Sequence, residues 1–461
     1  MAREKRVMQN AITEGVIWKQ LLLFFFPIVL GTFFQQLYNT ADAIIVGKFV
    51  GKEALAAVGG TTGTLINLLV GFFVGLSSGA SVIISQFYGA QRSEDVSRAV
   101  HTTMALALAS GAALTVLGIC LSKNVLIMMG TPADVLDYAV TYINIYFLGM
   151  IPSLIYNIGS GILRAVGDSR RPLFFLVSAT MTNIVLDIVL VIGLNLGVAG
   201  AAAATVLSQV VSAVLTVRCI HGSQGMPWHL QLKNIRIERS VLLAICRIGL
   251  PGAAQSALYS ISNMTIQSAI NGFGTVAVAA WSVYGKIDFL FWMTVSSFGI
   301  AVTTFAGQNF GARQYDRVRR GTMTCLAMTA GTTLCISLAL YPSAQLLFRL
   351  FSSDDAVVAQ GVQMMHYLVP VYMTYICIEI FSGALRGCGD VRVPTIITVF
   401  AVCIMRIVWL AVALPFKHEL SVVEFSYPLT WITATVLFAI YYAKGGWMQR
   451  CIEAQNAKTQ G

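Results

Sequence analysis

Twelve long apolar stretches run through this 461-residue chain, and they limit its possible folds more than any other feature. A bilayer core of roughly 30 Å is crossed by about 20 helical residues. Lipid offers the backbone no hydrogen-bond partner, and the stretches lack the alternation of barrel strands, so each must be a helix. We therefore predict an all-α membrane protein with twelve transmembrane helices. The expected spans are residues 20–47, 56–86, 99–121, 136–160, 172–194, 198–219, 241–270, 276–306, 321–345, 358–384, 394–416 and 425–444.

The composition excludes several other classes of protein. Hydrophobic residues make up 57% of the chain and charged residues 11%, a balance that no soluble class matches. The net charge of +10 would suggest nucleic acid as the partner of a soluble protein. Here the basic residues fall between apolar stretches, so we expect the lipid bilayer as a partner and no nucleic acid. The nine cysteines have no metal-like spacing, which indicates packing residues.

The chain contains an internal duplication. Residues 160–172 recur as 382–394, with eight of thirteen positions identical and no gap. The same numerical offset, 382 minus 160 or 222, also aligns residues 86–98 with 308–320. Two matches at one offset predict two pseudo-symmetric six-helix bundles that run parallel to each other in topology. We expect an N-terminal lobe at 1–220, a cytoplasmic linker at 221–240, a C-terminal lobe at 241–445 and a cytoplasmic tail at 446–461.

The distribution of basic residues predicts the orientation of the chain in the membrane. Of the 30 Lys and Arg residues, 23 fall on the side that holds the N-terminus, beginning with Arg3, Lys5 and Arg6, and five fall on the opposite side. Because cytoplasmic loops carry an excess of basic residues, both termini are expected in the cytoplasm.

Two further patterns predict packing rather than chemistry. Gly71, Gly75 and Gly79 recur every four residues on the second span, which favours close approach of another helix; a hinge is the alternative. The duplicated loops, which contain Asp168 and Asp390, are expected to tie adjacent helix ends together, with gating as the alternative.

Ionisable residues inside the spans of the first half point to an ion site. Inserting a charged group at the bilayer centre costs at least ~2.5 kcal/mol of free energy on insertion scales. Each such residue is therefore expected to have a function. Asp42 lies on the first span, after Pro27, which removes a backbone hydrogen bond and predicts a helix bend. Asp187 lies one turn after Asn183 on the fifth span, so their side chains share a face.

Two neutral side chains at comparable depth extend this site. Thr205 on the sixth span and Asn157 on the fourth supply further oxygen atoms. Two carboxylates, an amide and a hydroxyl suit a proton or a hard cation, and sodium is possible at Asp42, Asn183, Asp187 and Thr205. In the alternative, both carboxyls stay protonated and only accept hydrogen bonds between helices.

The second half carries different charges at the corresponding positions. Glu379 and Arg406 lie on adjacent spans, and an ion pair between them would lower the free-energy cost of burying both. A role facing the cavity, in substrate binding or gating, is the alternative. Lys286 and Asp288 are two residues apart on one helix and cannot face each other well. These four residues are our candidates for the cavity of the C-terminal lobe.

These features together resemble the multidrug and toxic compound extrusion (MATE) family over nearly the whole chain. The similar features are the two six-helix halves, Pro27 followed by Asp42, the duplicated loops, and the Asn183-x-x-x-Asp187 pair. The pattern is most similar to the prokaryotic branch named for DNA-damage-inducible protein F. The resemblance implies a secondary active multidrug efflux antiporter that exports amphipathic, often cationic, compounds in exchange for protons or sodium by alternating access. The coupling site that it implies consists of Asp42, Asn183, Asp187 and Thr205, surrounded by Asn157, Tyr38 and Tyr142.

Further expectations concern activity, cofactors, assembly and location. The chain would be no enzyme, would need no cofactor besides H⁺ or Na⁺ as the coupling ion, and would act as a monomer on small-molecule substrates in a bacterial-type plasma (inner) membrane. The alternative is a lipid-linked saccharide flippase, or an exporter of a specific metabolite, on the same superfold. A flippase would need a strongly basic cavity, whereas acidic residues balance the basic ones here. An ion channel is disfavoured because no carbonyl-filter motif is repeated.

Overall fold

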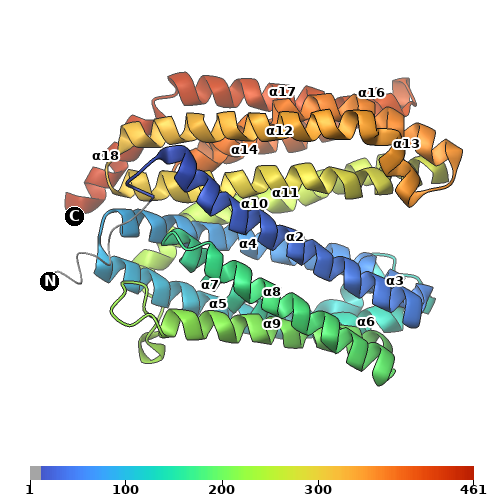
Figure 1. Ribbon diagram of the computed structural model, residues 1–461, viewed down its shortest axis with the longest axis horizontal. Helices are drawn as coiled ribbons and strands as arrows, with labels where there is room; N and C mark the ends of the chain where they lie inside the picture. The colour runs from blue at the N-terminus through green and yellow to red at the C-terminus, as the bar shows by residue number, and fades with distance from the viewer. Residues whose placement is uncertain (1–11, 461) are drawn as a thin grey trace. The chain divides into compact units, whose positions relative to one another are not determined.

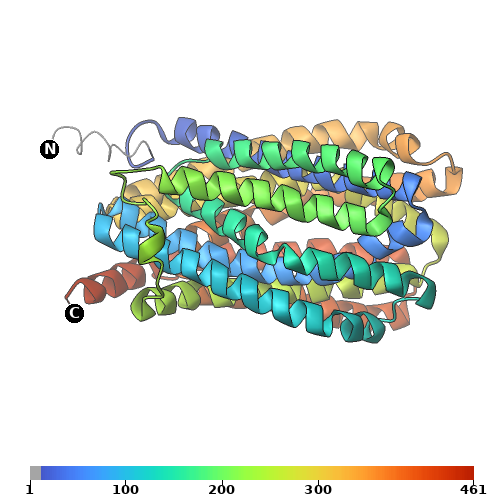
Figure 2. The same ribbon diagram turned by 90° about the horizontal axis from the view of Figure 1, so that it is seen from below.

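The computed structural model describes residues 12–460. These residues form α-helices with short 3₁₀ and π segments, and no strand occurs among them (Figures 1 and 2). The predicted all-α membrane fold is confirmed. Arg3, Lys5 and Arg6, which contribute to the predicted orientation, lie outside the described residues.

The predicted twelve crossings are also found within the described chain. Eleven helical segments are long and apolar enough to span a bilayer, and a twelfth crossing is a pair of helices bent by 52° at Gly149. This bent pair is α6 (Ala133–Leu148) with α7 (Met150–Ala165). The other crossings of the first half are α2 (Ile17–Phe49), α3 (Lys52–Gly59) with α4 (Thr61–Gly89), α5 (Ser93–Met128), α8 (Arg170–Asp187) with the π segment η1 (Ile188–Gly193), and α9 (Gly197–His221).

The crossings of the second half begin with α10 (Arg239–Asn271), α11 (Thr275–Gly311) and α12 (Tyr315–Phe351). They continue with α13 (Asp355–Leu368), the 3₁₀ turn η3 (Val369–Val371) and α14 (Tyr372–Gly387) as one crossing, α15 (Arg392–Thr398), the π segment η4 (Val399–Ile404) and α16 (Met405–Phe416) as the next, and α17 (Leu420–Lys444) as the last.

The internal duplication extends to the boundaries of the helices. The first and last residues of α14 are each 222 positions after those of α7. The first residue of α12 likewise lies 222 positions after that of α5. The turns before α5 and α12 also agree, because Gln91 and Arg313 have φ angles of 57° and 59°. Left-handed backbone is uncommon outside glycine. The two halves therefore share local turn geometry as well as sequence.

The chain divides into two compact units whose boundaries differ from the expected lobes. Unit 1 holds Leu23–Ala253, and unit 2 holds Ile12–Leu22 together with residues 254–460. The short N-terminal segment is fastened to the α11–α12 region, since Asn309 Nδ2 donates to the carbonyl of Ile12 at 3.4 Å. Sequence periodicity does not reveal such contacts between distant segments.

Each unit is built around central helices. In unit 1, α7 packs against α4, α5 and α9, and α8 runs beside α9 (Figure 1). In unit 2, α11 packs against α12, α13 and α14, and α14 also contacts α17. Because α7 and α14 are duplicated counterparts, the same helix of each half lies at the centre of its unit.

Glycines on α4 allow α10 to approach at backbone distance within unit 1. A Cβ atom on Gly75 would lie 2.6 Å from the backbone nitrogen of Ala253, and one on Gly79 would lie 2.7 Å from that of Gly249. Such separations require glycine. A Cβ on Gly71, by contrast, would meet nothing within 4 Å. The predicted packing role is therefore confirmed for two glycines and wrong for Gly71.

The linker and the tail are both fastened to a unit. In the linker, which contains the 3₁₀ turn η2 (Leu232–Asn234), the backbone N–H of Gln231 donates to Nε2 of His101 on α5 at 3.0 Å. Most of the predicted tail forms α18 (Trp447–Gln460). Arg450 on α18 donates to the hydroxyl of Tyr441 at 2.7 Å, which holds α18 against α17.

The duplicated loops make contacts that fit the structural interpretation. Asp168 accepts the backbone N–H groups of Arg170 and Arg171, each at 3.1 Å. Its carboxylate pairs with the side chain of Arg171 at 3.2 Å. Asp390 accepts the hydroxyl of Tyr441. Each Asp thus closes its loop onto a helix end.

Candidate functional site

Two residues of the candidate site lie on α2. This helix continues without a break through Pro27 to Phe49. Proline has no N–H to donate to the carbonyl four residues earlier, so the ladder of backbone hydrogen bonds is interrupted there. Tyr38 and Asp42 follow on the same helix, one turn apart and on one face. The Asp42 side chain is buried, with 6% of the residue exposed.

The structure brings most of the predicted residues together inside unit 1. The electrostatic neighbours of Tyr38 include Thr205, Asp42 and Asp187. Those of Tyr142 on α6 include Asp42, Tyr38 and Thr205. Asn183, Asp187 and Thr205 are almost wholly buried. Residues from α2, α6, α8 and α9 therefore converge on one polar cluster in an otherwise apolar bundle.

The polar atoms of this cluster lack partners in the described chain. Neither oxygen of Asp187 accepts a hydrogen bond, and the same is true of Asp42 Oδ1. Both amide atoms of Asn183 are also without a partner. The hydroxyl of Thr205 forms no hydrogen bond of standard geometry, although it lies beside Tyr38 and Tyr142. Buried polar groups are usually hydrogen-bonded, because an unsatisfied one costs about 1–3 kcal/mol. The alternative in which the carboxyls serve only as acceptors between helices is therefore not supported.

A π segment begins directly after the cluster. α8 ends at Asp187, and η1 continues it from Ile188 to Gly193. Short π segments within α-helices occur frequently at functional sites, because they locally widen the helix. The sequence pattern predicted a regular helix here.

Asn157 is the predicted residue that the structure does not join to the cluster. Its Nδ2 donates to the carbonyl of Ser153 on its own helix at 2.9 Å, and no hydrogen bond connects it to Asp42 or Asp187 in the described chain. The side-chain amide of Asn157 is therefore held within its own helix and not by the cluster.

Two further residues belong beside the site, although the sequence analysis did not include them. Tyr146 stacks on Tyr142, with ring centroids 6.2 Å apart and an interplanar angle of 23°, and it is an electrostatic neighbour of Tyr38. Gln209 neighbours Tyr146 in turn. Each lies one turn beyond a predicted site residue, Tyr142 or Thr205, so four-residue spacing of polar residues was the available signal.

The expected ion pair in unit 2 is not formed. No ion pair joins Glu379 to Arg406 among the described residues. The Arg406 guanidinium instead lies over the ring of Tyr427, 4.5 Å from its centroid, and donates to Thr430 Oγ1 at 3.4 Å. Glu379 accepts a long hydrogen bond of 3.5 Å from the hydroxyl of Tyr375. Adjacent helices do not fix which of their faces meet. Here Arg406 contacts Tyr427 and Thr430, whereas Glu379 contacts Tyr375 and has Arg386 as its charged neighbour.

Lys286 and Asp288 face different environments, as their spacing predicted. The Lys286 ammonium lies 5.4 Å from the ring centroid of Phe351 on α12, and its side chain is exposed. Asp288 Oδ2 accepts the indole N–H of Trp292 at 2.6 Å, while its Oδ1 has no partner in the described chain. Asp288 and Glu379 are thus held by aromatic donors within unit 2, and Lys286 lies outside that arrangement.

Comparison with known proteins finds similarity along most of the chain. The sequence model of the MatE family matches residues 27–189 and 251–412. A Bacillus subtilis (strain 168) protein named "Probable multidrug resistance protein YoeA" is 28% identical over 436 residues, which cover 92% of this chain and 93% of that protein.

Two solved structures have a similar fold. One is described as the outward-facing conformation of a multidrug resistance MATE family transporter of the MOP superfamily. It superposes with a TM-score of 0.88 at 23% identity, covering 97% of this chain and 98% of that one. The other is a MOP superfamily transporter from Pyrococcus furiosus, whose reverse polarity of the binding pocket is said to suggest a different function. Its TM-score is 0.88 at 23% identity, with coverage of 96% and 98%.

Proposed function

Because this chain belongs to the multidrug and toxic compound extrusion family, a family of membrane transporters rather than enzymes, we propose that it is a secondary active multidrug efflux antiporter. Its substrates would be amphipathic organic cations, and its driving ion H⁺ or Na⁺. The coupling ion would act at the cluster of Asp42, Asn183, Asp187 and Thr205.

One observation carries this proposal. Two carboxyls, an amide and a hydroxyl meet in the interior of unit 1, and most of their polar atoms have no protein partner in the described chain. A proton would neutralise one carboxylate, and a sodium ion would take oxygen atoms from all four side chains.

The two carboxyls supply the electrostatic part of the mechanism. Asp42 and Asp187 come from different helices and influence each other as charged neighbours. Two ionised carboxylates in a medium of low polarity repel, and a proton or cation removes that repulsion. Loading the site therefore draws α2 towards α8, and unloading separates them. Because Pro27 weakens the hydrogen-bond ladder of α2, the helix has a natural position at which to bend.

Coupling requires that ion and drug stabilise different states. A ligand with equal affinity for two states shifts neither. In this proposal the ion favours the state that holds the drug weakly, and the drug favours the state with an empty coupling site. Alternating access then follows, because ion binding releases the drug and drug binding releases the ion.

The interior of unit 2 supports a cationic, partly aromatic substrate. Trp292, Tyr375 and Trp431 form edge-to-face ring pairs, with centroids 4.7 to 6.1 Å apart. Aromatic faces attract cations, and the guanidinium of Arg406 lies over the ring of Tyr427 in this way. The carboxyls of Asp288, Glu379 and Glu424 against the guanidinium of Arg406 give this interior no excess of positive charge, which disfavours the pyrophosphate carrier of a saccharide flippase.

Dye transport by inverted membrane vesicles tests the proposal. Ethidium uptake would be recorded under an imposed proton gradient and then under a sodium gradient, for the wild type and for Asp42→Asn. We expect uptake under one gradient and its loss in the variant. Absence of uptake under both gradients, across a panel of organic cations, would overturn the proposal.

A further inference from the structure

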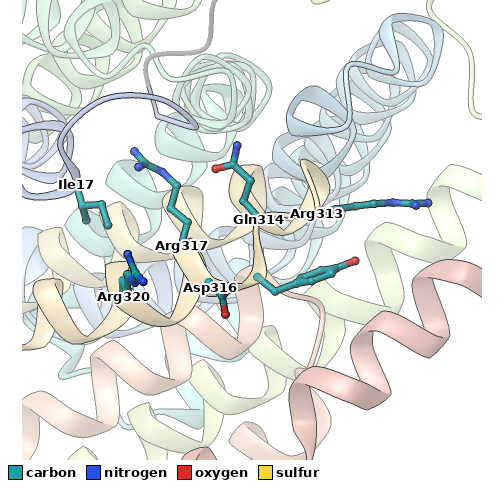
Figure 3. A pocket seen from close by; sticks show the side chains of 7 residues that line it. Ile17, Arg313, Gln314, Asp316, Arg317 and Arg320 are labelled. Atoms are coloured by element: carbon teal, nitrogen blue, oxygen red, sulfur yellow. The ribbon is translucent and has the colours of Figure 1, made fainter.

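A basic pocket lies at the start of α12, in unit 2 and apart from the coupling site. It has a volume of about 490 Å³, within the usual range of small-molecule sites. Its walls come from the turn between α11 and α12, the first two turns of α12, and the beginning of α2 (Figure 3). The lining residues are Ile17, Arg313, Gln314, Tyr315, Asp316, Arg317 and Arg320.

Within residues 12–460, most of the positive charge of this pocket has no acidic partner. Arg313 and Arg320 make no ion pair or side-chain hydrogen bond in the described chain. Arg317 donates to the backbone carbonyls of Ile12 at 3.2 Å and Glu14 at 3.0 Å. Asp316 is the one acidic residue in the wall, and its carboxylate extends to the opposite side from the Arg317 guanidinium (Figure 3).

The duplicated turn in the first half provides an internal comparison. There, Asp95 pairs with Arg92 at 2.6 Å and with Arg98 at 3.9 Å, and Glu238 adds a second acid to Arg98. At the offset of 222 residues, the counterpart of Asp95 is Arg317 and the counterpart of Arg98 is Arg320. The central acid of the first turn is therefore an arginine in the second. The same backbone turn is charge-balanced in one half and uncompensated in the other.

The backbone adds to the attraction for an anion. The first N–H groups of a helix have no partner within it and point towards its N-terminal end. Gln314, at the N-cap of α12, makes no side-chain capping hydrogen bond. The N-terminal end of α12 thus faces the same pocket as the arginines.

The position of the pocket along the helices fits the boundary between hydrocarbon and water. It joins the first turns of two membrane-spanning helices, α2 and α12. Beside Ile17, Trp18 is 48% exposed and carries the ammonium of Lys19 over its ring at 5.5 Å. Exposed Trp and Lys at a helix end are typical of the boundary between hydrocarbon and water.

We propose that this pocket binds the phosphate of an anionic phospholipid headgroup. Arg317 and Arg320 are three residues apart and therefore neighbours on α12, so they can contact phosphate oxygens together. Arg317 also holds the carbonyls of Ile12 and Glu14, so a bound phosphate would add to the attachment of the N-terminal segment to unit 2.

Lipid retention by the purified protein in neutral detergent tests this proposal. Native mass spectrometry would measure binding of phosphatidylglycerol and of phosphatidylcholine, with inorganic phosphate and glycerophosphate as soluble competitors. The test variant is Arg313→Gln with Arg320→Gln, which leaves the contacts of Arg317 in place. The control is Arg319→Gln with Lys444→Gln, which removes two charges from exposed side chains of unit 2 outside the pocket. Because the readout is lipid binding, it does not depend on transport.

We expect wild type and control to retain phosphatidylglycerol in preference to phosphatidylcholine, and the pocket variant to bind phosphatidylglycerol about tenfold or more weakly, since each basic residue near an anionic surface contributes several-fold. Arg320→Gln alone should show an intermediate loss. An equal loss in the control would mean general surface charge and overturn the proposal. Binding of glycerophosphate or inorganic phosphate without a preference for phosphatidylglycerol would overturn the lipid assignment.

Discussion

Asp187 at the end of α8 has Asp42 of α2 as its charged neighbour in the interior of unit 1. Both carboxyls are buried, and neither forms an ion pair in the described part of the chain. Like charges in a poorly polar environment cannot both persist without a proton or a cation. The occupancy of this pair by a proton or cation therefore determines how strongly α2 and α8 repel each other.

Asp42→Asn and Asp187→Asn should each abolish ion-driven drug transport. Asparagine keeps the shape of the side chain, but it neither takes up and releases a proton as a carboxyl does nor supplies an anionic ligand. Since the two carboxyls act as one unit, the double variant should be no worse than either single one. Drug efflux from proteoliposomes is the measurement. Asp137→Asn, on the exposed face of α6, is the matched control and should transport normally. Full activity in either buried-site variant would contradict the role of the pair.

Pro27→Ala should stabilise the protein and slow its transport cycle. Alanine restores the missing backbone hydrogen bond of α2, an effect worth up to about 3 kcal/mol in a helix interior. The thermal midpoint should rise and turnover should fall by about tenfold. Pro342→Ala, inside α12, should raise the midpoint without slowing transport. Equal slowing in both variants would mean that the effect is not specific to α2.

Gly79→Ala should destabilise unit 1, whereas Gly71→Ala should not. The added methyl group of the first variant would meet the backbone of α10 at 2.6 to 2.9 Å. Overpacking of this kind costs about 1–3 kcal/mol. The methyl group at position 71 has no neighbour within 4 Å. Thermal unfolding followed by tryptophan fluorescence distinguishes the two, and matching midpoints would show that α4 and α10 are not closely packed.

Glu379 and Arg406 should behave as energetically independent residues. A buried ion pair loses about 3–5 kcal/mol when one partner is removed, and such partners couple strongly. Here Arg406 is held by Tyr427 and Thr430 instead. A double-mutant cycle of Glu379→Gln and Arg406→Gln should give a coupling energy below about 0.5 kcal/mol, the limit within which independent sites are additive. A value of several kcal/mol would restore the ion pair that the sequence predicted.

Contacts along one helix could be predicted from the sequence because they follow fixed spacing. The pairs Asn183 with Asp187 and Tyr38 with Asp42 each lie four residues apart, so their shared faces follow from helix geometry. The twelve crossings follow from bilayer thickness in the same way. The constant offset between the two halves predicted which segments correspond, and the similar φ angles at Gln91 and Arg313 agree with it.

Contacts between helices could not be predicted, because they depend on how each helix is rotated. Glu379 and Arg406 lie on neighbouring spans yet turn towards different aromatic residues. Asn157 is satisfied by Ser153 on its own helix. The bend at Gly149 and the π segment after Asp187 are local departures from a regular helix. Hydrophobic periodicity does not reveal such departures, because the apolar stretch continues through them.

Competition between ion and drug would show whether the Asp42 and Asp187 pair couples ion binding to drug binding. The affinity of the purified protein for a fluorescent organic cation would be measured across a pH series at fixed sodium, and across a sodium series at high pH. In the wild type we predict that affinity falls as the coupling ion increases, either as pH decreases or as sodium rises. In Asp187→Asn the affinity should no longer respond. Wild-type affinity that is independent of both pH and sodium would contradict the account.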